Sequence, residues 1–215
     1  HVAAARGADD SCRALMIAGA DPNVRDRRKR SPLHLLLGGA DKDVVDRHGR
    51  TALFKAAVNN HLEAVQELLA GANYSLRTNG SRSPLDIAAG RGHADVLKAL
   101  LDKGSSEVDA TNYFGWAVLH YAASVDGPVR DNGDAVRALL GAGADVNTQI
   151  TDDICCTPLH VAVDRRIAPD GTIRALLEGG ANIDARTAGD QTPLHAACTR
   201  SSVGVVELLL RWGAD

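Results

Sequence analysis

Histidine and cysteine are the residues of this chain with the clearest chemical potential. The 215 residues include eight histidines and four cysteines. Imidazole and thiolate are common ligands of zinc, and histidine exchanges protons near neutral pH. No H-x-x-x-H, H-E-x-x-H or C-x-x-C spacing occurs, so neither residue type is arranged as a metal site. We therefore predict no metal site, no cofactor and no catalytic residue in the chain.

The acidic pair Asp152-Asp153 and the thiol pair Cys155-Cys156 form the one compact group that looks reactive. A nucleophilic thiol needs a histidine or a basic neighbour to lower its pKa, and none lies beside this pair. We interpret the group as an acidic loop. The cysteines are not spaced as a disulfide framework, which favours a reducing intracellular setting, cytoplasmic or nuclear. They are Cys12, Cys155, Cys156 and Cys198.

The histidines follow a repeated phrase, Ser/Thr-Pro-Leu-His. It is intact at residues 31–34, 157–160 and 192–195, and degraded at 51–54, 83–86 and 117–120. The last position of the phrase holds five of the eight histidines: His1, His34, His120, His160 and His195. A second phrase, Gly-Ala-Asp or Gly-Ala-Asn, follows at a nearly constant distance. A short unit repeated in this way predicts a stacked solenoid, and solenoids provide binding surfaces.

The last unit predicts the structure of each repeat. Pro193 suits the first turn of a helix. A second helix follows, because Val205, Leu208 and Leu209 fall on one helical face. Gly213 then favours the left-handed conformation that ends helices. With turn residues between units, the sequence predicts an all-α repeat solenoid of stacked helix-turn-helix units joined by hairpin-like fingers.

These phrases recur in phase, and the chain resembles the ankyrin repeat family over essentially its whole length. The resemblance implies a protein-interaction function, and it implies that the histidine of the first phrase ties the finger to the helix by hydrogen bonds. We predict a single ankyrin repeat domain over residues 1–215. Its units are expected at about 1–25, 26–45, 46–77, 78–111, 112–150, 151–186 and 187–215. The incomplete first and last units predict that this is a piece of a longer chain.

Two spacings depart from the family period. His34 and Phe54 are only 20 positions apart, so the second unit is abnormally short and we expect residues to be missing between His34 and Gly38. His120 and His160 are 40 positions apart. Some of that excess lengthens the finger at 150–156. Insertions in solenoids often lie on a binding face, but loops also tolerate length changes at little cost, and we favour neutral loop growth.

The fingers differ sharply in chemistry along the chain. Residues 1–107 carry 16 Lys and Arg against 13 Asp and Glu, whereas residues 108–215 carry 8 against 14. Three of the seven aromatic residues fall in one finger, at 109–117. Arginine and exposed aromatic residues dominate interface energetics. We therefore predict a partner-binding surface made of Arg27, Arg28, Arg30, Arg47, Arg50, Arg82, Tyr113, Phe114, Trp116 and Ile154.

The expected partner is a protein or peptide, with an acidic segment beneath the first fingers and an apolar anchor against the aromatic finger. We expect the chain to be a monomer. Nucleic-acid or phosphoinositide binding is the alternative for the basic fingers, and the net charge of −3 argues against it. A further alternative is that the chain is the recognition arm of an enzyme such as a kinase or ubiquitin ligase. No apolar run approaches the ~20 residues of a membrane span.

Asparagine hydroxylation is a smaller hypothesis. Asn23 and Asn147 resemble the context in which ankyrin repeats are hydroxylated. The same residues are also the family consensus, and we favour that interpretation.

Overall fold

The computed structural model describes residues 42–43, 45–104, 108–124, 131–151, 153–165, 170–200 and 203–215. Arg27, Arg28, Arg30, Asp152 and the segment between His34 and Gly38 lie outside these residues, and so do Asn23 and Cys12. Within the described part of the chain the secondary structure is entirely helical, with ten helices and no strand, as the sequence predicts. The helices are α3 (Ala52–Val58), α4 (Leu62–Leu68), α5 (Pro84–Gly90), α6 (Ala94–Gly104), α7 (Val118–Ser124), α8 (Gly133–Gly141), α9 (Pro158–Val163), α10 (Asp170–Glu178), α11 (Pro193–Thr199) and α12 (Val203–Arg211).

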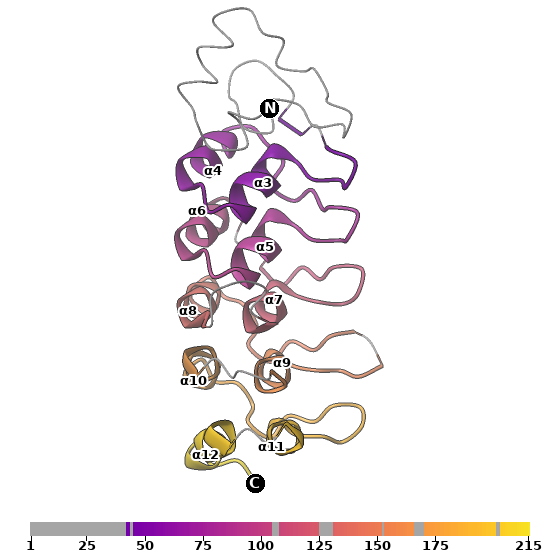
Figure 1. Cartoon of the computed structure of the whole chain (residues 1–215), viewed down its shortest axis with the longest axis vertical. Coiled ribbons are helices and arrows are strands. Elements are labelled where there is room, and N and C mark those ends of the chain that lie inside the picture. The colour runs from indigo at the N-terminus through magenta and orange to yellow at the C-terminus, as the bar shows by residue number, and fades with distance from the viewer. Residues whose placement is uncertain are drawn as a thin grey trace, which may run out of the picture.

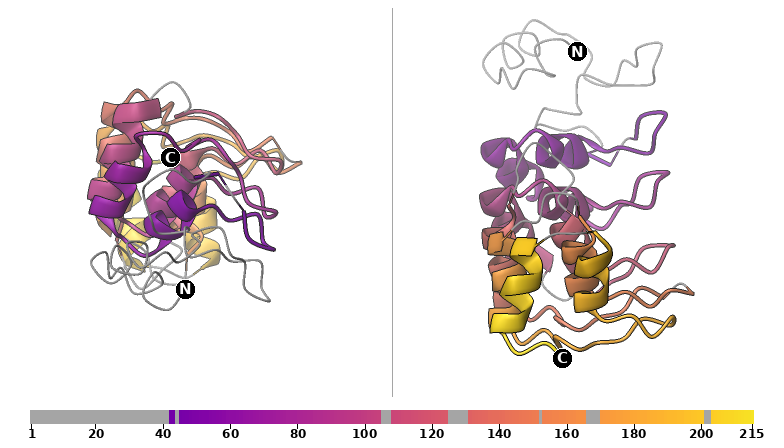
Figure 2. Two further views of the ribbon diagram at one scale, coloured as in Figure 1. Left: turned by 90° about the horizontal axis from the view of Figure 1, so that it is seen from above. Right: turned by 60° about the horizontal axis from the view of Figure 1, so that its bottom comes forward.

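Consecutive helices pair, and the pairs stack into a two-layered column (Figure 1). Helices α3, α5, α7, α9 and α11 form one layer, in which each contacts the next, and α4, α6, α8 and α10 do the same in the other. The fingers between pairs all project to the same side (Figure 2). Each expected unit from 46–77 onward contains one helix pair, while the unit boundaries themselves stay a prediction.

The first helix of a pair begins at a reciprocal cap. Thr157 accepts a hydrogen bond from the backbone N–H of His160, and the imidazole of His160 accepts one from the N–H of Thr157. Thr192 and His195 form the same arrangement. Because each side chain satisfies a backbone group that the helix leaves unpaired, the Thr-Pro-Leu-His phrase is a helix start signal as well as a family signature.

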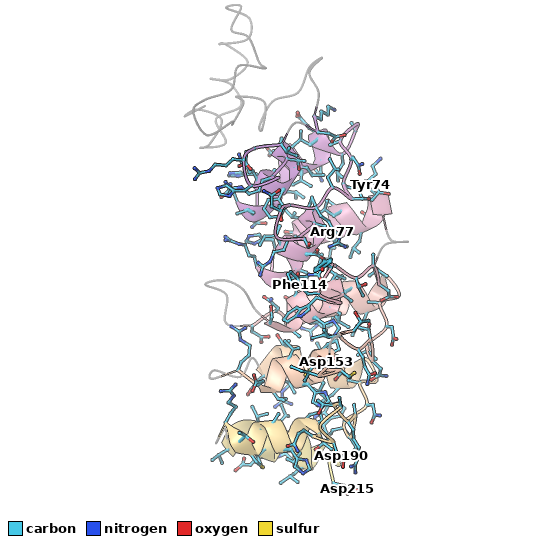
Figure 3. All side chains as sticks on the ribbon, turned by 90° about the vertical axis from the view of Figure 1, so that its right-hand side faces the viewer. Tyr74, Arg77, Phe114, Asp153, Asp190 and Asp215 are labelled. Atoms are coloured by element: carbon cyan, nitrogen blue, oxygen red, sulfur yellow. The ribbon has the colours of Figure 1, made fainter. Side chains whose placement is uncertain are left out.

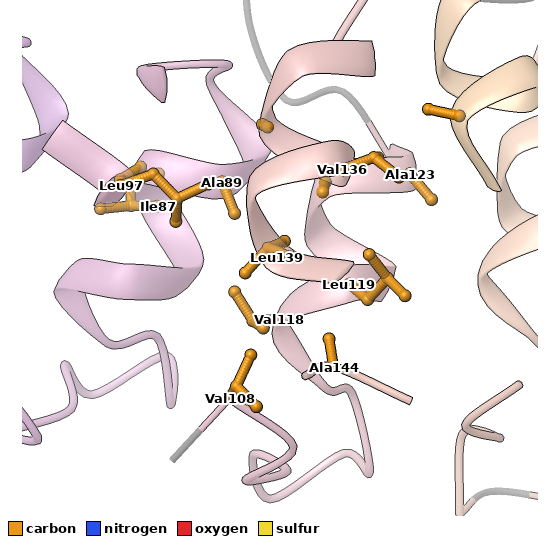
Figure 4. Packing of buried hydrophobic residues seen from close by; sticks show 14 of the residues in the cluster. Ile87, Ala89, Leu97, Val108, Val118, Leu119, Ala123, Val136, Leu139 and Ala144 are labelled. Carbon is orange, nitrogen blue, oxygen red and sulfur yellow. The ribbon is translucent and has the colours of Figure 1, made fainter. Parts of the chain in front are cut away.

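The core is a thin layer between the two rows of helices. The first helices contribute small residues, such as the fully buried Ala88, Ala122 and Ala162, which allow close approach. The second helices contribute Leu97, Leu139 and other aliphatic side chains that are equally buried (Figure 4). Burying each leucine contributes about 1.5–3 kcal/mol. Repeated along the column, this term holds the helices in register and so fixes the spacing of the fingers.

Each finger turns through a residue in the left-handed conformation. In the finger before α7, the N–H of Asn112 bonds to the carbonyl oxygen of Trp116 at 3.0 Å, and Gly115 has a φ of 76°. A Cβ atom on Gly115 would collide with the side chain and backbone of Thr151 in the next finger. The residues with positive φ at the other finger turns are Gly49, Ser81, Cys155 and Asp190.

Polar contacts also link one unit to the next. The N–H of Asn79 bonds to the carbonyl oxygen of His48 at 3.0 Å, and the N–H of Ala188 bonds to that of Ile154 at 2.9 Å, so neighbouring fingers are joined along their backbones. Beside the second helices, the carboxamide oxygen of Asn147 accepts a 2.7 Å bond from the N–H of Asn182. Each of these contacts therefore joins two consecutive units.

Candidate functional site

The finger before α7 presents two exposed aromatic rings at its tip. Tyr113 is 89% exposed and Phe114 is 59% exposed, and their rings meet edge to face with centroids 5.5 Å apart. Large apolar side chains are usually covered, since exposing them forfeits the free energy of burial. The structure thus places both predicted aromatics on the surface, next to each other.

Trp116, the third predicted aromatic residue of this finger, lies differently. It is half-buried, with its ring centroid 5.2 Å from that of Tyr121 and 5.9 Å from that of His120. Both neighbours belong to α7, the helix that the finger precedes. Trp116 therefore packs against its own unit and is held in place from within.

Tyr121 joins Trp116 to the preceding basic finger. It is buried, its hydroxyl accepts a hydrogen bond from the side-chain amide of Asn112, and the guanidinium of Arg82 lies 5.2 Å from its ring centroid. Burial, followed by the nearby Asp86 carboxylate, raises the pKa of Tyr121, and Arg82 opposes that shift. Arg82, Tyr121 and Trp116 form a contact chain across two units.

An apolar groove of about 790 Å³ opens beside Trp116 and runs across the finger that follows it. Ile150 and Ile154 line it from that finger, while Val161 on α9 and Ala196 on α11 line it from the helices. Ile154 is 57% exposed. The remaining lining residues are Ser124, Cys156, His160, Asp164, Arg165, Thr187 and Gln191.

His160 lines the groove and is held in place by polar contacts at both ring nitrogens. Its Nε2 atom lies 3.0 Å from the carbonyl oxygen of Gln191 and its Nδ1 atom lies 2.8 Å from the hydroxyl of Thr157. Burial lowers the pKa of His160, against the opposing effect of the carbonyl groups of Gln191 and Ala185. A neutral imidazole satisfies both contacts, because one nitrogen donates and the other accepts. His120 makes the corresponding bond to the carbonyl oxygen of Cys156 at 3.1 Å.

These contacts confirm the role that the family resemblance implies for the histidine of the repeated phrase. The side chain of His120 or His160 reaches from a first helix to the finger of the next unit. Asp86 occupies the same position in the preceding unit, and its carboxylate accepts hydrogen bonds from the N–H of Ser83 and the guanidinium of Arg77, both in the finger before α5.

The predicted arginines that the structure describes differ in their partners. Arg47 is exposed, and its Nε donates to the ring nitrogen of His48. Arg50 instead pairs with the buried carboxylate of Asp46 at 2.9 Å, as Lys55 does at 3.1 Å. Burial favours a higher pKa for Asp46, but the bonds from Arg50, His48 and Lys55 outweigh it and hold the pKa well below its usual range.

Figure 3 faces the finger side of the column and labels residues along it. Arg77 lies on the side of α5, Phe114 follows, and then Asp153, Asp190 and Asp215 appear in chain order. Arg77 pairs with the buried Asp86 at 2.8 Å, and Asp190 pairs with Arg186 at 2.7 Å. Asp153 is exposed at the tip of the finger that lines the groove.

Ile150, Val161, Asp164, Ala196 and the groove itself were not predicted from the sequence. One signal in the sequence does point to part of the groove. The position after the histidine of the repeated phrase varies from unit to unit while its neighbours stay Leu and Ala. In successive units, the residue directly after the last position of the phrase is Lys55, Ile87, Tyr121, Val161 and Ala196. Three of these five residues contact Trp116 or line the groove.

Apolar exposure also occurs at the far end of the column, on α12. Val203 is 70% exposed and Leu210 is 54% exposed. Among the described residues, no group of three or more His, Cys, Asp or Glu side chains is placed to hold a metal ion. None of the helices in the described ranges has the length and apolar character needed to cross a membrane.

Comparison with known proteins identifies the repeat. A family model described as "Ankyrin repeats (3 copies)" matches residues 1–77, 33–112, 76–150 and 119–215. The nuclear factor NF-kappa-B p105 subunit of Gallus gallus is 34% identical over 170 residues, which are 77% of this chain and 16% of that protein. The E3 ubiquitin-protein ligase KEG of Arabidopsis thaliana is 26% identical over the full chain and 12% of its own length. The human ankyrin repeat and SOCS box protein 16 is 31% identical over 99% of this chain and 42% of its own length. The chain thus spans less than half of each of these relatives.

Proposed function

The chain belongs to the ankyrin repeat family, and on that basis we propose that it is a protein-interaction module that binds a partner protein or peptide through its fingers and first helices. The observation that carries the proposal is the pair Tyr113 and Phe114, exposed side by side on the finger whose Trp116 lines an apolar groove. Aromatic anchors surrounded by polar residues are typical of interface centres. The partner side chains would cover both rings and enter the groove.

The proposal assigns no reaction to these residues, since ankyrin repeat domains generally act by binding. The name of one relative identifies it as a ubiquitin ligase, and this chain matches only 12% of that protein. An activity elsewhere in a longer chain, with these residues as its recognition arm, is therefore the second candidate. An intracellular location, cytoplasmic or nuclear, stays a prediction from the cysteine pattern.

A random peptide display library tests the proposal without requiring that the partner be identified first. Peptides selected on this chain should lose at least ~10-fold in affinity for the double variant Tyr113→Ser/Phe114→Ser, a loss of about 1.4 kcal/mol. The matched control is Val203→Ser/Leu210→Ser, which removes two similarly exposed apolar side chains from α12. Selected peptides that bind both double variants as well as the parent chain would contradict the proposed surface.

The same titrations separate peptide binding from anion binding. An anionic ligand held by basic fingers would lose affinity steeply with added salt, because it displaces counterions. A peptide anchored on apolar side chains should lose little between low and moderate salt. Binding of a short oligonucleotide or an inositol phosphate that depends on Arg47 and is indifferent to Tyr113 would favour the alternative.

A further inference from the structure

We propose that the groove between Trp116 and Ile154 receives apolar side chains of an extended peptide segment that is acidic on one flank and basic on the other. The acidic flank lies over the fingers that carry Arg47 and Arg82, and the basic flank lies over the finger that carries Asp153. This inference rests on the proposed function and specifies the chemistry of the partner.

The size and lining of the groove select apolar side chains. Its volume of about 790 Å³ is within the range of roughly 300–1,000 Å³ typical of ligand sites. A cavity of roughly 150 Å³ already holds a benzene ring, so the groove has room for more than one large side chain. Ile150, Ile154 and Val161 offer no hydrogen-bonding side chain, and a charged group placed between them would lose its hydration without compensation.

The walls of the groove are held in place without a partner. Trp116 packs on Tyr121 and His120, and His160 is bonded at both ring nitrogens. The carbonyl oxygen of Ile154 accepts a bond from the N–H of Ala188 in the next finger at 2.9 Å. A preformed site avoids much of the ordering cost of binding.

The charges on either side of the groove have opposite signs. On the α5 side, the finger at 75–83 carries Arg82, together with Arg77, which is paired with the buried Asp86, and it has no acidic residue of its own. The finger at 150–156, which itself lines the groove, carries the exposed Asp153 and no basic residue. Asp164 also lines the groove, but its charge is neutralised by Arg200, whose guanidinium donates bonds of 2.6 and 2.9 Å to the two carboxylate oxygens. A bound segment is therefore attracted at its two ends by opposite charges.

The spacing of the units sets the length of the segment. Packed helices lie about 8–10 Å apart, so neighbouring fingers are separated by roughly that distance. An extended chain advances about 3.3 Å per residue, or about 3 residues per unit. The acidic flank is thus expected about 3–6 residues from the apolar anchor, and about 10–12 residues reach from the finger of Arg47 to that of Asp190.

A peptide is favoured over a nucleic acid by the same charges. Residues 108–215 carry six more acidic than basic residues, which repels a phosphate chain that continues past the groove. A peptide can change the sign of its charge within a few residues, and a nucleic acid cannot.

Synthetic peptides of about 14 residues test the proposal, with tryptophan omitted from their sequences. The probe carries a glutamate block, a Leu-x-x-Ile anchor and a lysine block. Control peptides replace the lysine block by glutamate, the glutamate block by lysine, or the two anchor residues by serine. Affinities are measured by fluorescence polarisation on the parent chain and on Ile154→Ser, Asp153→Lys and Arg47→Glu. These three side chains are exposed, so their replacement leaves the core intact.

The probe is expected to bind at least ~10-fold more tightly than each control peptide, and Ile154→Ser should remove most of that advantage. Asp153→Lys should weaken binding of the probe and strengthen binding of the peptide with two glutamate blocks. Arg47→Glu should likewise weaken binding of the probe and strengthen binding of the peptide with two lysine blocks. This exchange of preference is a readout that misfolding cannot imitate.

If the probe bound no more tightly than the two control peptides whose blocks carry the same charge, the proposed order of acidic and basic flanks would be overturned. Equal affinity of the serine-anchor peptide would overturn the groove as the anchor site. Library peptides that require Tyr113 and Phe114 but tolerate Ile154→Ser would overturn this inference and leave the proposed function standing. If no selected peptide depended on Tyr113 and Phe114 for binding, the proposed function itself would be contradicted.

Discussion

The Nε2 atom of His160 lies 3.0 Å from the backbone carbonyl oxygen of Gln191, which belongs to the finger of the next unit. The same ring accepts a bond from the cap of its own helix through Nδ1. One side chain therefore starts a helix, positions the following finger and forms part of the groove wall. The histidine of the repeated Thr-Pro-Leu-His phrase thus has all three roles.

His160→Ala is expected to destabilise the chain by about 1–3 kcal/mol, because it removes the part-buried hydrogen bond to Gln191 and leaves a helix cap without its partner. His195→Ala is the matched control. His195 caps its own helix in the same way but is exposed, so a smaller loss of about 0.5–2 kcal/mol is expected. Urea unfolding followed by circular dichroism measures both. An equal midpoint shift for the two variants would show that the contact with Gln191 adds nothing.

The stability of the chain should fall as the pH drops from about 7 towards about 5. Burial lowers the pKa of both His93 and His160 in the folded state. As the pH falls through about 6.5, the unfolded chain takes up protons first, so the stability present above about pH 7 is progressively lost. Each histidine contributes at most about 1.4 kcal/mol per pH unit.

The pH dependence is assigned by comparing urea midpoints of the parent chain and His160→Ala over that range. The variant should have a shallower slope, because one titrating group has been removed. A slope unchanged by the substitution would assign the acid sensitivity to other groups.

Asp46→Asn should destabilise the first described finger by about 1–3 kcal/mol at neutral pH. The carboxylate accepts bonds from the N–H groups of His48 and Arg50 and from the Arg50 guanidinium. An asparagine fits such a turn, since Asn112 makes the equivalent bonds to the N–H groups of Phe114 and Trp116. What the variant loses is the charge.

The depressed pKa of Asp46 means that its stabilisation is present above about pH 4 and is lost as the pH falls further. The unfolding free energies of Asp46→Asn and the parent chain should therefore converge in acid. A constant difference between them down to about pH 2 would contradict a charge-dependent role.

Gly115→Ala should destabilise the aromatic finger by more than backbone strain alone, because the added Cβ atom also collides with the next finger. Gly115 has a φ of 76°, and an added Cβ would collide with Thr151. Gly143→Ala is the control, because Gly143 also has a positive φ, of 92°, but its added Cβ meets nothing within 4 Å. Both variants carry the backbone strain of about 1 kcal/mol, and only Gly115→Ala should also weaken peptide binding. Equal effects on binding would show that contact between the two fingers is unimportant for the site.

The sequence predicted the fold well because the fold is local. Thr157, Pro158 and His160 lie within four residues of each other and determine the helix start that the structure shows. The exposure of Tyr113 and Phe114 also follows from a turn read along the chain. The groove could not be predicted in this way, because Ile150, Val161 and Ala196 come from three separate segments that only stacking brings together.

The partners of the arginines could not be predicted from the sequence. Arg47, Arg50 and Arg82 look alike in the sequence, but the structure gives each a different partner. Arg50 is bound to a buried carboxylate and Arg82 covers an aromatic ring, whereas Arg47 remains exposed. Whether a charge faces solvent or a buried acid depends on residues such as Asp46 and Tyr121, whose burial a sequence pattern does not state.

Fluorescence emission from Trp116 reports whether a partner peptide binds against that ring, which is the contact on which the proposed site depends. Trp116 and Trp212 are the two tryptophans of the chain, so Trp212→Phe leaves Trp116 as the sole reporter. Titration with the tryptophan-free probe peptide should shift the emission of Trp116 to shorter wavelength, with the same midpoint as the polarisation measurement. Saturable binding that leaves the emission of Trp116 unchanged would contradict a binding site at this residue.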